Sequence, residues 1–252
     1  MNNKVIAFIL ARMGSSRFPG KVLADLNGKS VLQHVIDGVK MAKTVDDIVI
    51  VTTKTNTGDN LPIIDLAEKE GVKYSYEYGP SALDEFMKAS RKFPAEIIVR
   101  VTADAPLVSH EAIDRLVKHL RETGGDYTHN RHKYGVPHGF HAEAVRADAM
   151  EKVYQLVEED EHKQHITLFI LQNPNLFKIE NFPEDKEIQM PNVVLSIDRP
   201  EELERVKKIF VDLGEDIHNL KKAVEYLKSK PEFKEDEIDY HMDYMDVIHG
   251  EM

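Results

Sequence analysis

The chain has 252 residues, of which 42% are hydrophobic, enough to build one globular domain or one domain with a small appendage. Asp and Glu number 44 against 33 Lys and Arg, and the resulting formal net charge of -11 disfavours nonspecific binding to nucleic acid or to an anionic membrane. Cysteine is absent, which excludes disulfides, thiolate catalysis and zinc–thiolate sites and fits a reducing cytoplasm, where we expect the protein to reside.

The first half of the chain alternates short apolar runs with amphipathic segments. The N-terminal run is too short to span a membrane and predicts a buried strand, with no signal peptide. Buried parallel strands are predicted at 5–10, 48–51 and 97–101. Helices should begin after three serine caps, Ser30, Ser81 and Ser109, and Ser81 has the capping-box spacing to Asp84. This alternation predicts an α/β fold with a doubly wound, mostly parallel sheet.

The pattern changes from residue 126 onward. Strands are predicted at 127–130, 141–145 and 193–198, and helices at 148–158, at 162–172, from Pro200 and again around 220–227. We expect one domain over 1–230, with an inserted β-rich segment at about 126–190 lying over the sheet edge and serving dimerisation or substrate binding. Residues 231–252 form an acidic arm with Tyr and Met, which either packs on this chain or a partner or is a solvated tail.

The loop after the first strand, residues 9–23, reads I-L-A-R-M-G-S-S-R-F-P-G-K-V-L. Glycines allow backbone amides to turn inward, serines add small donors, and the cations balance phosphate charge, so the loop is predicted to bind a polyphosphate. Five residues separate Gly14 from Gly20 and Val22 follows Lys21, which excludes the nucleotide-hydrolase phosphate loop. The loop also lacks the glycine triplet of the dinucleotide fingerprint.

Two aspartates follow predicted strands. Asp104 is followed by Ala105 and Pro106, which keeps the segment from continuing as a helix, and Asp198 ends the apolar run 193–197. Ligands of doubly wound sheets bind at the carboxyl ends of the strands, and carboxylates suit Mg²⁺. Alternatively, Asp104 caps a turn and Asp198 is the N-cap of the following helix.

With these motifs the chain resembles the spore-coat polysaccharide-type and acylneuraminate-type cytidylyltransferases. The resemblance rests on the loop, on T-A-D-A-P-L at 102–107, on S-I-D-R-P-E-E-L at 196–203, on P-H-G-F-H-A-E at 137–143 and on H-I-T at 165–167. Ala103, His138 and Arg199 depart from the residues common in that family, which leaves the acceptor open.

The resemblance implies a nucleotidyltransferase, Rossmann-like domain and a set of site residues. Catalytic roles fall to Arg12, Lys21, Asp104 and Asp198, and the two aspartates would bind Mg²⁺. Nucleotide-binding positions are Leu10, Ala11, Arg12, Gly14, Ser15, Ser16, Arg17, Lys21, Thr102 and Ala103. Acceptor-binding positions are Asn130, His138, Gly139, Glu143 and His165.

Other polar residues are candidates beside this set. Arg100, Arg131, Lys133 and His138 are candidates to hold an anionic acceptor. The histidines lack the spacing of a zinc site, so His129 and His132 are expected to line a polar pocket. On one predicted helix, His162 and His165 would share a face.

The implied reaction is Mg²⁺-dependent transfer of CMP from CTP to an acidic sugar or a small phosphorylated or phosphonate acceptor, with release of pyrophosphate. The implied partners are CTP and a small anionic acceptor, in a homodimer that binds neither nucleic acid nor membrane. One alternative is a metal-dependent glycosyltransferase, although Asp104-Ala105-Pro106 lacks the second aspartate of an Asp-x-Asp motif. The other alternative is a non-catalytic nucleotide-binding protein.

Overall fold

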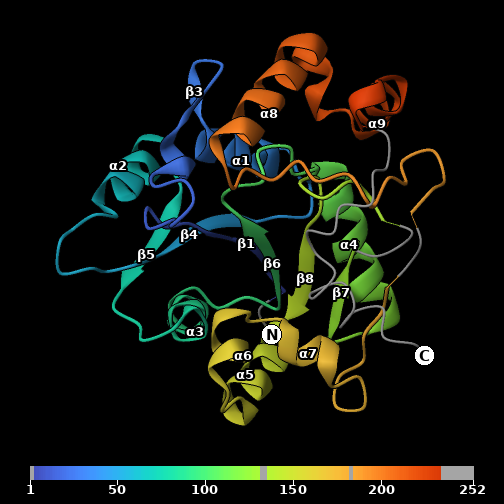
Figure 1. Ribbon diagram of the computed structural model, residues 1–252. Helices are drawn as coiled ribbons and strands as arrows, with labels where there is room; N and C mark the ends of the chain where they lie inside the picture. The colour runs from blue at the N-terminus through green and yellow to red at the C-terminus, as the bar shows by residue number, and fades with distance from the viewer. Residues whose placement is uncertain (1–2, 131–134, 182–183, 234–252) are drawn as a thin grey trace.

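A computed structural model describes residues 3–130, 135–181 and 184–233. Its main sheet has the strand order β5-β4-β1-β6-β8-β7 (Figure 1). The first four strands run parallel: β5 (Lys73–Glu77), β4 (Asp47–Thr53), β1 (Val5–Leu10) and β6 (Ile97–Thr102). The last three were predicted as parallel strands, whereas β5 was not predicted. β8 (Glu143–Arg146) pairs antiparallel with both β6 and β7 (Tyr127–His129). The doubly wound, mostly parallel sheet is therefore confirmed.

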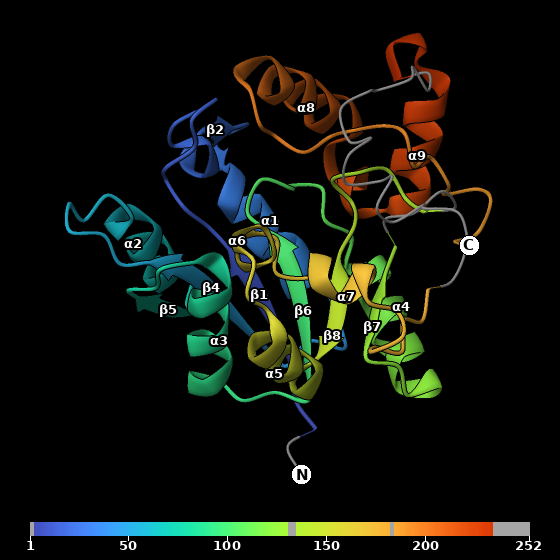
Figure 2. The same ribbon diagram turned by 60° about the horizontal axis from the view of Figure 1, so that its bottom comes forward.

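Helices cover both faces of this sheet because successive side chains of β1 point to opposite faces. Val5, Ala7 and Ile9 pack with α1 (Val31–Lys40), α2 (Leu61–Lys69) and α4 (His110–Thr123). On the other face, Ile6 and Phe8 pack with α3 (Ala82–Lys92) and α5 (Ala147–Leu156), and the two views agree on this layering (Figure 2).

Three of the helices begin as the sequence predicts. Ser30 and Gln33 form a full capping box on α1, and Ser109 accepts the amide of Ala112 in α4. Ser81 accepts the amide of Asp84, but the Asp84 carboxylate accepts the hydroxyl of Ser81 at 2.5 Å and that of Tyr154 at 3.1 Å. The reciprocal bond expected for a capping box at Ser81 is therefore replaced by a link from α3 to α5.

A C-terminal helical layer packs against the edge of this core. It contains α8 (Pro200–Leu213), η2 (Gly214–His218) and α9 (Leu220–Ser229), and its apolar cluster includes Leu26 and Phe140. Leu26 belongs to a small hairpin, β2 (Asp25–Leu26) with β3 (Lys29–Ser30), and η1 (Lys21–Leu23) precedes it. The start of the predicted arm forms η3 (Pro231–Phe233), and the rest of that arm lies outside the described residues.

The segment 126–190 differs from the expected β-rich insertion. Its strands β7 and β8 extend the main sheet itself rather than lying over its edge, and helices follow them. The single helix predicted at 162–172 is two short helices, α6 (Asp160–Gln164) and α7 (Leu168–Gln172). The break falls at His165, which has φ -105° and ψ 73°, so His162 and His165 do not share a helical face.

The strand predicted at 193–198 is extended backbone that stays outside the sheet ladder. Val193 and Leu195 exchange hydrogen bonds with the backbone of His138, and the amide of Ile197 donates to the carbonyl of Asp104 at 2.9 Å. These bonds bring the segment to the end of β6 without adding a strand to the sheet. Over the described residues, no helix is long and apolar enough to cross a membrane.

Candidate active site

A cavity of about 660 Å³ opens at the carboxyl ends of β1, β4 and β6. All the residues that the sequence analysis assigned to nucleotide binding lie on its wall: Leu10, Ala11, Arg12, Gly14, Ser15, Ser16, Arg17, Lys21, Thr102 and Ala103. Asp104, Asp198 and His165 line it as well. The topology therefore gathers segments that are far apart in the sequence at the edge of the sheet where ligands of this architecture bind.

The N-terminal loop is held by backbone hydrogen bonds within the loop and by one bond to the side chain of Asn60. The carbonyl of Met13 accepts the amides of Ser15 and Gly20, both at 3.0 Å, and the amide of Met13 donates to Asn60 Oδ1 at 2.8 Å. Gly20 has φ +73°, a left-handed conformation that disfavours any side chain, whereas the φ of Gly14 is not positive. Only the second glycine is therefore required by the backbone conformation.

Lys21 joins the two predicted metal-binding aspartates. Its Nζ lies 2.5 Å from Asp104 Oδ2 and 2.6 Å from Asp198 Oδ1, and its side chain is 11% exposed. Burial alone would lower the pKa of Lys21, but the two carboxylates outweigh it and raise that pKa above its ordinary value. Despite its own burial, Asp198 has a lowered pKa because Lys21 and Arg17 favour its charged form.

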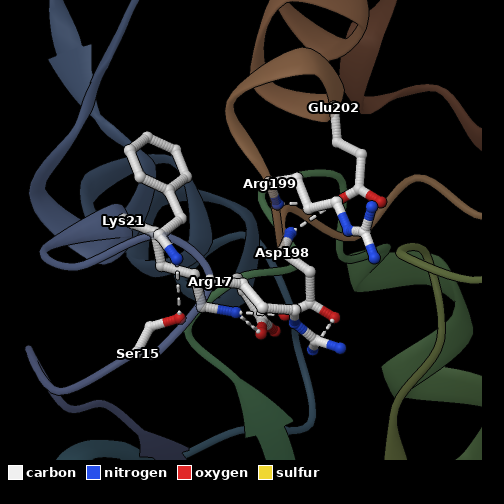
Figure 3. A network of polar contacts seen from close by, with 8 residues as sticks. Ser15, Arg17, Lys21, Asp198, Arg199 and Glu202 are labelled. Carbon is white, nitrogen blue, oxygen red and sulfur yellow. Dashed lines mark hydrogen bonds and ion pairs between the residues drawn. The ribbon is translucent and has the colours of Figure 1, made fainter.

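Arg17 binds the same aspartate from the exposed side of the loop. Its Nη2 lies 2.7 Å from Asp198 Oδ2, so each oxygen of Asp198 accepts from a different cation of the loop (Figure 3). The N-cap position of α8 is Arg199, and the carboxylate of Asp198 turns away from that helix toward the loop. The interpretation of Asp198 as the helix N-cap is therefore wrong.

The donor set fits a magnesium ion. Two carboxylates from separate segments of the chain approach one cationic group, and Mg²⁺ prefers hard oxygen ligands of this kind. Over the described residues, no group of three or more His, Asp or Glu side chains could hold a metal ion. An ion bound by Asp104 and Asp198 would need oxygens from water or phosphate to complete its shell, as Mg²⁺ commonly does beside nucleotides.

Of the predicted acceptor-binding residues, one lies on the wall of this cavity. Asn130, His138, Gly139 and Glu143 are absent from the lining, whereas His165 is part of it. The carbonyl oxygen of the Asn130 side chain accepts the amide of Ala142 at 3.0 Å, and Gly139, with φ +115°, packs against the backbone of Leu195.

Glu143 reaches the cavity only through Arg100. Its Oε1 accepts from Arg100 Nη1 at 3.0 Å, the Glu143 side chain is 3% exposed, and Arg100 lines the cavity. His129 is buried within β7 and is not part of the lining of this cavity. Arg131, His132 and Lys133 lie outside the described residues.

Sequence reasoning missed other residues of the wall, namely Val22, Val51, Ala82, Glu85 and Gln164. Burial raises the pKa of the Glu85 carboxyl, against a hydrogen bond from Thr53 and the charge of Arg12, which favour its ionised form. The cap at Ser81 predicted the start of α3, but no local pattern indicates which turn of a helix faces a cavity. These positions become visible only in the tertiary structure.

Comparison with known proteins identifies the family of this chain. A family model for cytidylyltransferases matches residues 6–235. The spore coat polysaccharide biosynthesis protein SpsF of Bacillus subtilis is 29% identical over 84% of this chain and 89% of its own. A 3-deoxy-manno-octulosonate cytidylyltransferase of Bdellovibrio bacteriovorus is 33% identical, over 46% of this chain and 45% of the relative.

A solved structure shares the fold over nearly the whole chain. The cytidylyltransferase of Leptospira borgpetersenii superposes with a TM-score of 0.85 at 24% identity, covering 95% of this chain and 100% of that one. The extent of the family match favours nucleotidyl transfer over the glycosyltransferase and the non-catalytic alternatives. The chain therefore belongs to the cytidylyltransferase family and is a CTP-dependent nucleotidyltransferase.

Proposed function

We propose that this protein transfers CMP from CTP to an acidic sugar or to a small phosphorylated or phosphonate acceptor, with Mg²⁺ as its cofactor. The observation that carries the proposal is the convergence of Asp104 and Asp198 on Lys21 in a cavity lined by the N-terminal loop. Its volume of about 660 Å³ lies within the range of small-molecule sites. The acidic acceptor is supported by the name of the Bdellovibrio relative, whose substrate is a sugar acid.

The chain's own residues would act mainly by positioning and by charge. An acceptor oxygen attacks the α-phosphorus of CTP, a new O–P bond forms, and the bond to the β-phosphate oxygen breaks to release pyrophosphate. Arg12, Arg17, Lys21 and the loop amides would hold the β- and γ-phosphates and neutralise the charge that grows on the departing pyrophosphate. Mg²⁺ held by Asp104 and Asp198 would supply electrostatic stabilisation of the phosphoryl oxygens.

The acceptor would lie against the wall formed by Arg100, Gln164 and His165. These side chains line the cavity together with Asp104, and Arg100 offers a cation to an anionic acceptor. A hydroxyl acceptor loses its proton during the attack, whereas a phosphate or phosphonate acceptor attacks as an anion. Both kinds of acceptor stay within the proposal.

We also propose a homodimer located in the cytoplasm. The acidic arm with Tyr240, Met242, Tyr244 and Met245 is the segment we assign to the dimer contact, and the cysteine-free composition supports a reducing compartment. Size-exclusion chromatography of a chain truncated after Pro231 tests the arm. An elution volume that still corresponds to a dimer would contradict this role.

The experiment that tests the reaction measures pyrophosphate release with CTP, UTP, ATP and GTP, each with Mg²⁺ and a pool of acidic sugars, sugar phosphates and phosphonic acids. Of the four nucleotides, we expect only CTP to give pyrophosphate release, and we expect Asp104→Ala to abolish that release. Splitting the pool then identifies the acceptor. Release that persists in EDTA or in Asp104→Ala would contradict the metal-dependent mechanism.

A further inference from the structure

Glu202, on the first turn of α8, holds the backbone on which Asp198 stands. Its Oε2 accepts the amide of Asp198 at 2.5 Å and the amide of Arg199 at 2.8 Å. Figure 3 shows this carboxylate reaching back from the helix to the turn, while the Asp198 side chain leaves the same turn toward Arg17 and Lys21. One oxygen atom thus binds two successive amides beside a predicted metal ligand.

This segment needs such a support because it lies outside the sheet ladder. The backbone before Asp198 is held by bonds to His138 and Asp104, and the carbonyl of Val194 accepts from the Arg205 guanidinium. After Asp198 the next helical residue is Pro200, which has no amide hydrogen to donate. The two amides bound by Glu202 are therefore the last donors of the turn before α8 begins.

We propose that Glu202 is a positioning residue, which fixes the turn so that Asp198 presents its carboxylate to the metal side of the cavity. This inference rests on the proposed function, because it assumes that Asp198 takes part in binding Mg²⁺. Groups that orient metal ligands from behind influence metal affinity and activity, typically by roughly 10- to 100-fold. A helix cap without this role would affect only the stability of α8.

The neighbouring Glu201 offers a matched control. It lies on the same turn and carries the same charge, but its side chain is 69% exposed and its ion-pair contact is with Arg199 Nη1 at 3.9 Å. Glu201→Ala therefore removes the same charge from the helix start and leaves the two amides with their acceptor. Glu202→Gln removes the charge of Glu202 and keeps an oxygen that accepts hydrogen bonds.

The test is calorimetric titration of each variant with CTP, once in EDTA and once in excess Mg²⁺, without acceptor. The ratio of the two affinities measures the gain due to the metal. We expect Glu202→Ala to reduce this gain roughly tenfold or more with unchanged affinity in EDTA. Glu201→Ala should retain the whole gain and Glu202→Gln most of it.

Three results would overturn the inference. In the first, Glu202→Ala keeps the wild-type gain and only its melting temperature falls. In the second, the affinity for CTP falls equally with and without Mg²⁺. In the third, Glu202→Gln is as defective as Glu202→Ala. Failure of the proposed function is distinguishable, because the wild-type protein itself would then show no gain from Mg²⁺.

Discussion

Lys21 Nζ lies 2.5 Å from Asp104 Oδ2, although 83 positions separate the two residues in the chain. Asp198 binds the same ammonium group from the C-terminal side. The pairing makes the phosphate loop and the two acidic segments one electrostatic unit, so a change in any of the three residues should affect the other two.

Asp104→Asn should reduce pyrophosphate release from CTP at least roughly 100-fold, because the metal loses a carboxylate and stabilisation by a metal ion contributes several kcal/mol. Initial rates over a series of Mg²⁺ concentrations provide the measurement. The exposed Asp216, which pairs with Lys222 at 2.7 Å, serves as the control in Asp216→Asn. Equal rates in the two variants would count against a metal-binding role for Asp104.

Lys21→Met should lower the free energy of unfolding by about 1–3 kcal/mol, because it leaves two half-buried carboxylates without their shared ammonium group. Added Mg²⁺ should restore more stability to this variant than to the wild type, since the carboxylates then share a metal ion instead. Thermal unfolding in EDTA and in Mg²⁺ measures both effects. The idea fails if Mg²⁺ stabilises the two proteins equally.

Gly20→Ala should destabilise the protein by about 1 kcal/mol and raise the KM for CTP, because φ +73° is costly for a residue with a side chain. Gly14→Ala provides the matched control in the same loop, since no atom lies within 4 Å of an added Cβ there and its φ is not positive. Melting temperature and CTP kinetics of both variants are compared. A larger effect at Gly14 than at Gly20 would contradict this account of the loop.

Acidification should destabilise the fold through two histidines of the C-terminal helical layer and its contacts, namely His218 in η2 and His34, whose ring packs against Phe210 of α8. Burial lowers the pKa of His34 and of His218, with the nearby His110 adding to the effect at His218. Because the unfolded state then binds more protons, their contribution to stability is complete above about pH 6.5 and declines as pH falls toward the folded pKa values.

Chemical denaturation at about pH 7.5 and about pH 5.5 measures this loss. His218→Gln should show a smaller loss than the wild type, because one of the groups that titrates is gone. His34→Gln serves as the parallel variant, because His34 is the other histidine whose pKa is lowered by burial. Losses that are identical in all three proteins would assign the effect to other groups.

The sequence by itself determined much of this protein, where the signals are local. Short apolar runs predicted three of the parallel strands, helical spacing of apolar residues predicted the helices around them, and serine caps located three helix starts. The loop 9–23 and the two aspartates predicted a phosphate and metal site, because the residues that suggest each function lie within a few positions of one another. Such features depend on short-range sterics and hydrogen bonding, so a single segment suffices to indicate them.

Only the tertiary structure decided how distant segments meet. The run at 193–198 has the composition of a strand, but its backbone partners are His138 and Asp104 rather than a sheet ladder. The segment predicted as one helix breaks at His165, and Glu143 turns toward Arg100 behind the cavity wall. The ion pairs of Lys21 with two aspartates depend on the relative placement of separate elements, and so does the bond from the Asp198 amide to Glu202. That placement is fixed by packing across the whole core, which no local pattern in the sequence contains.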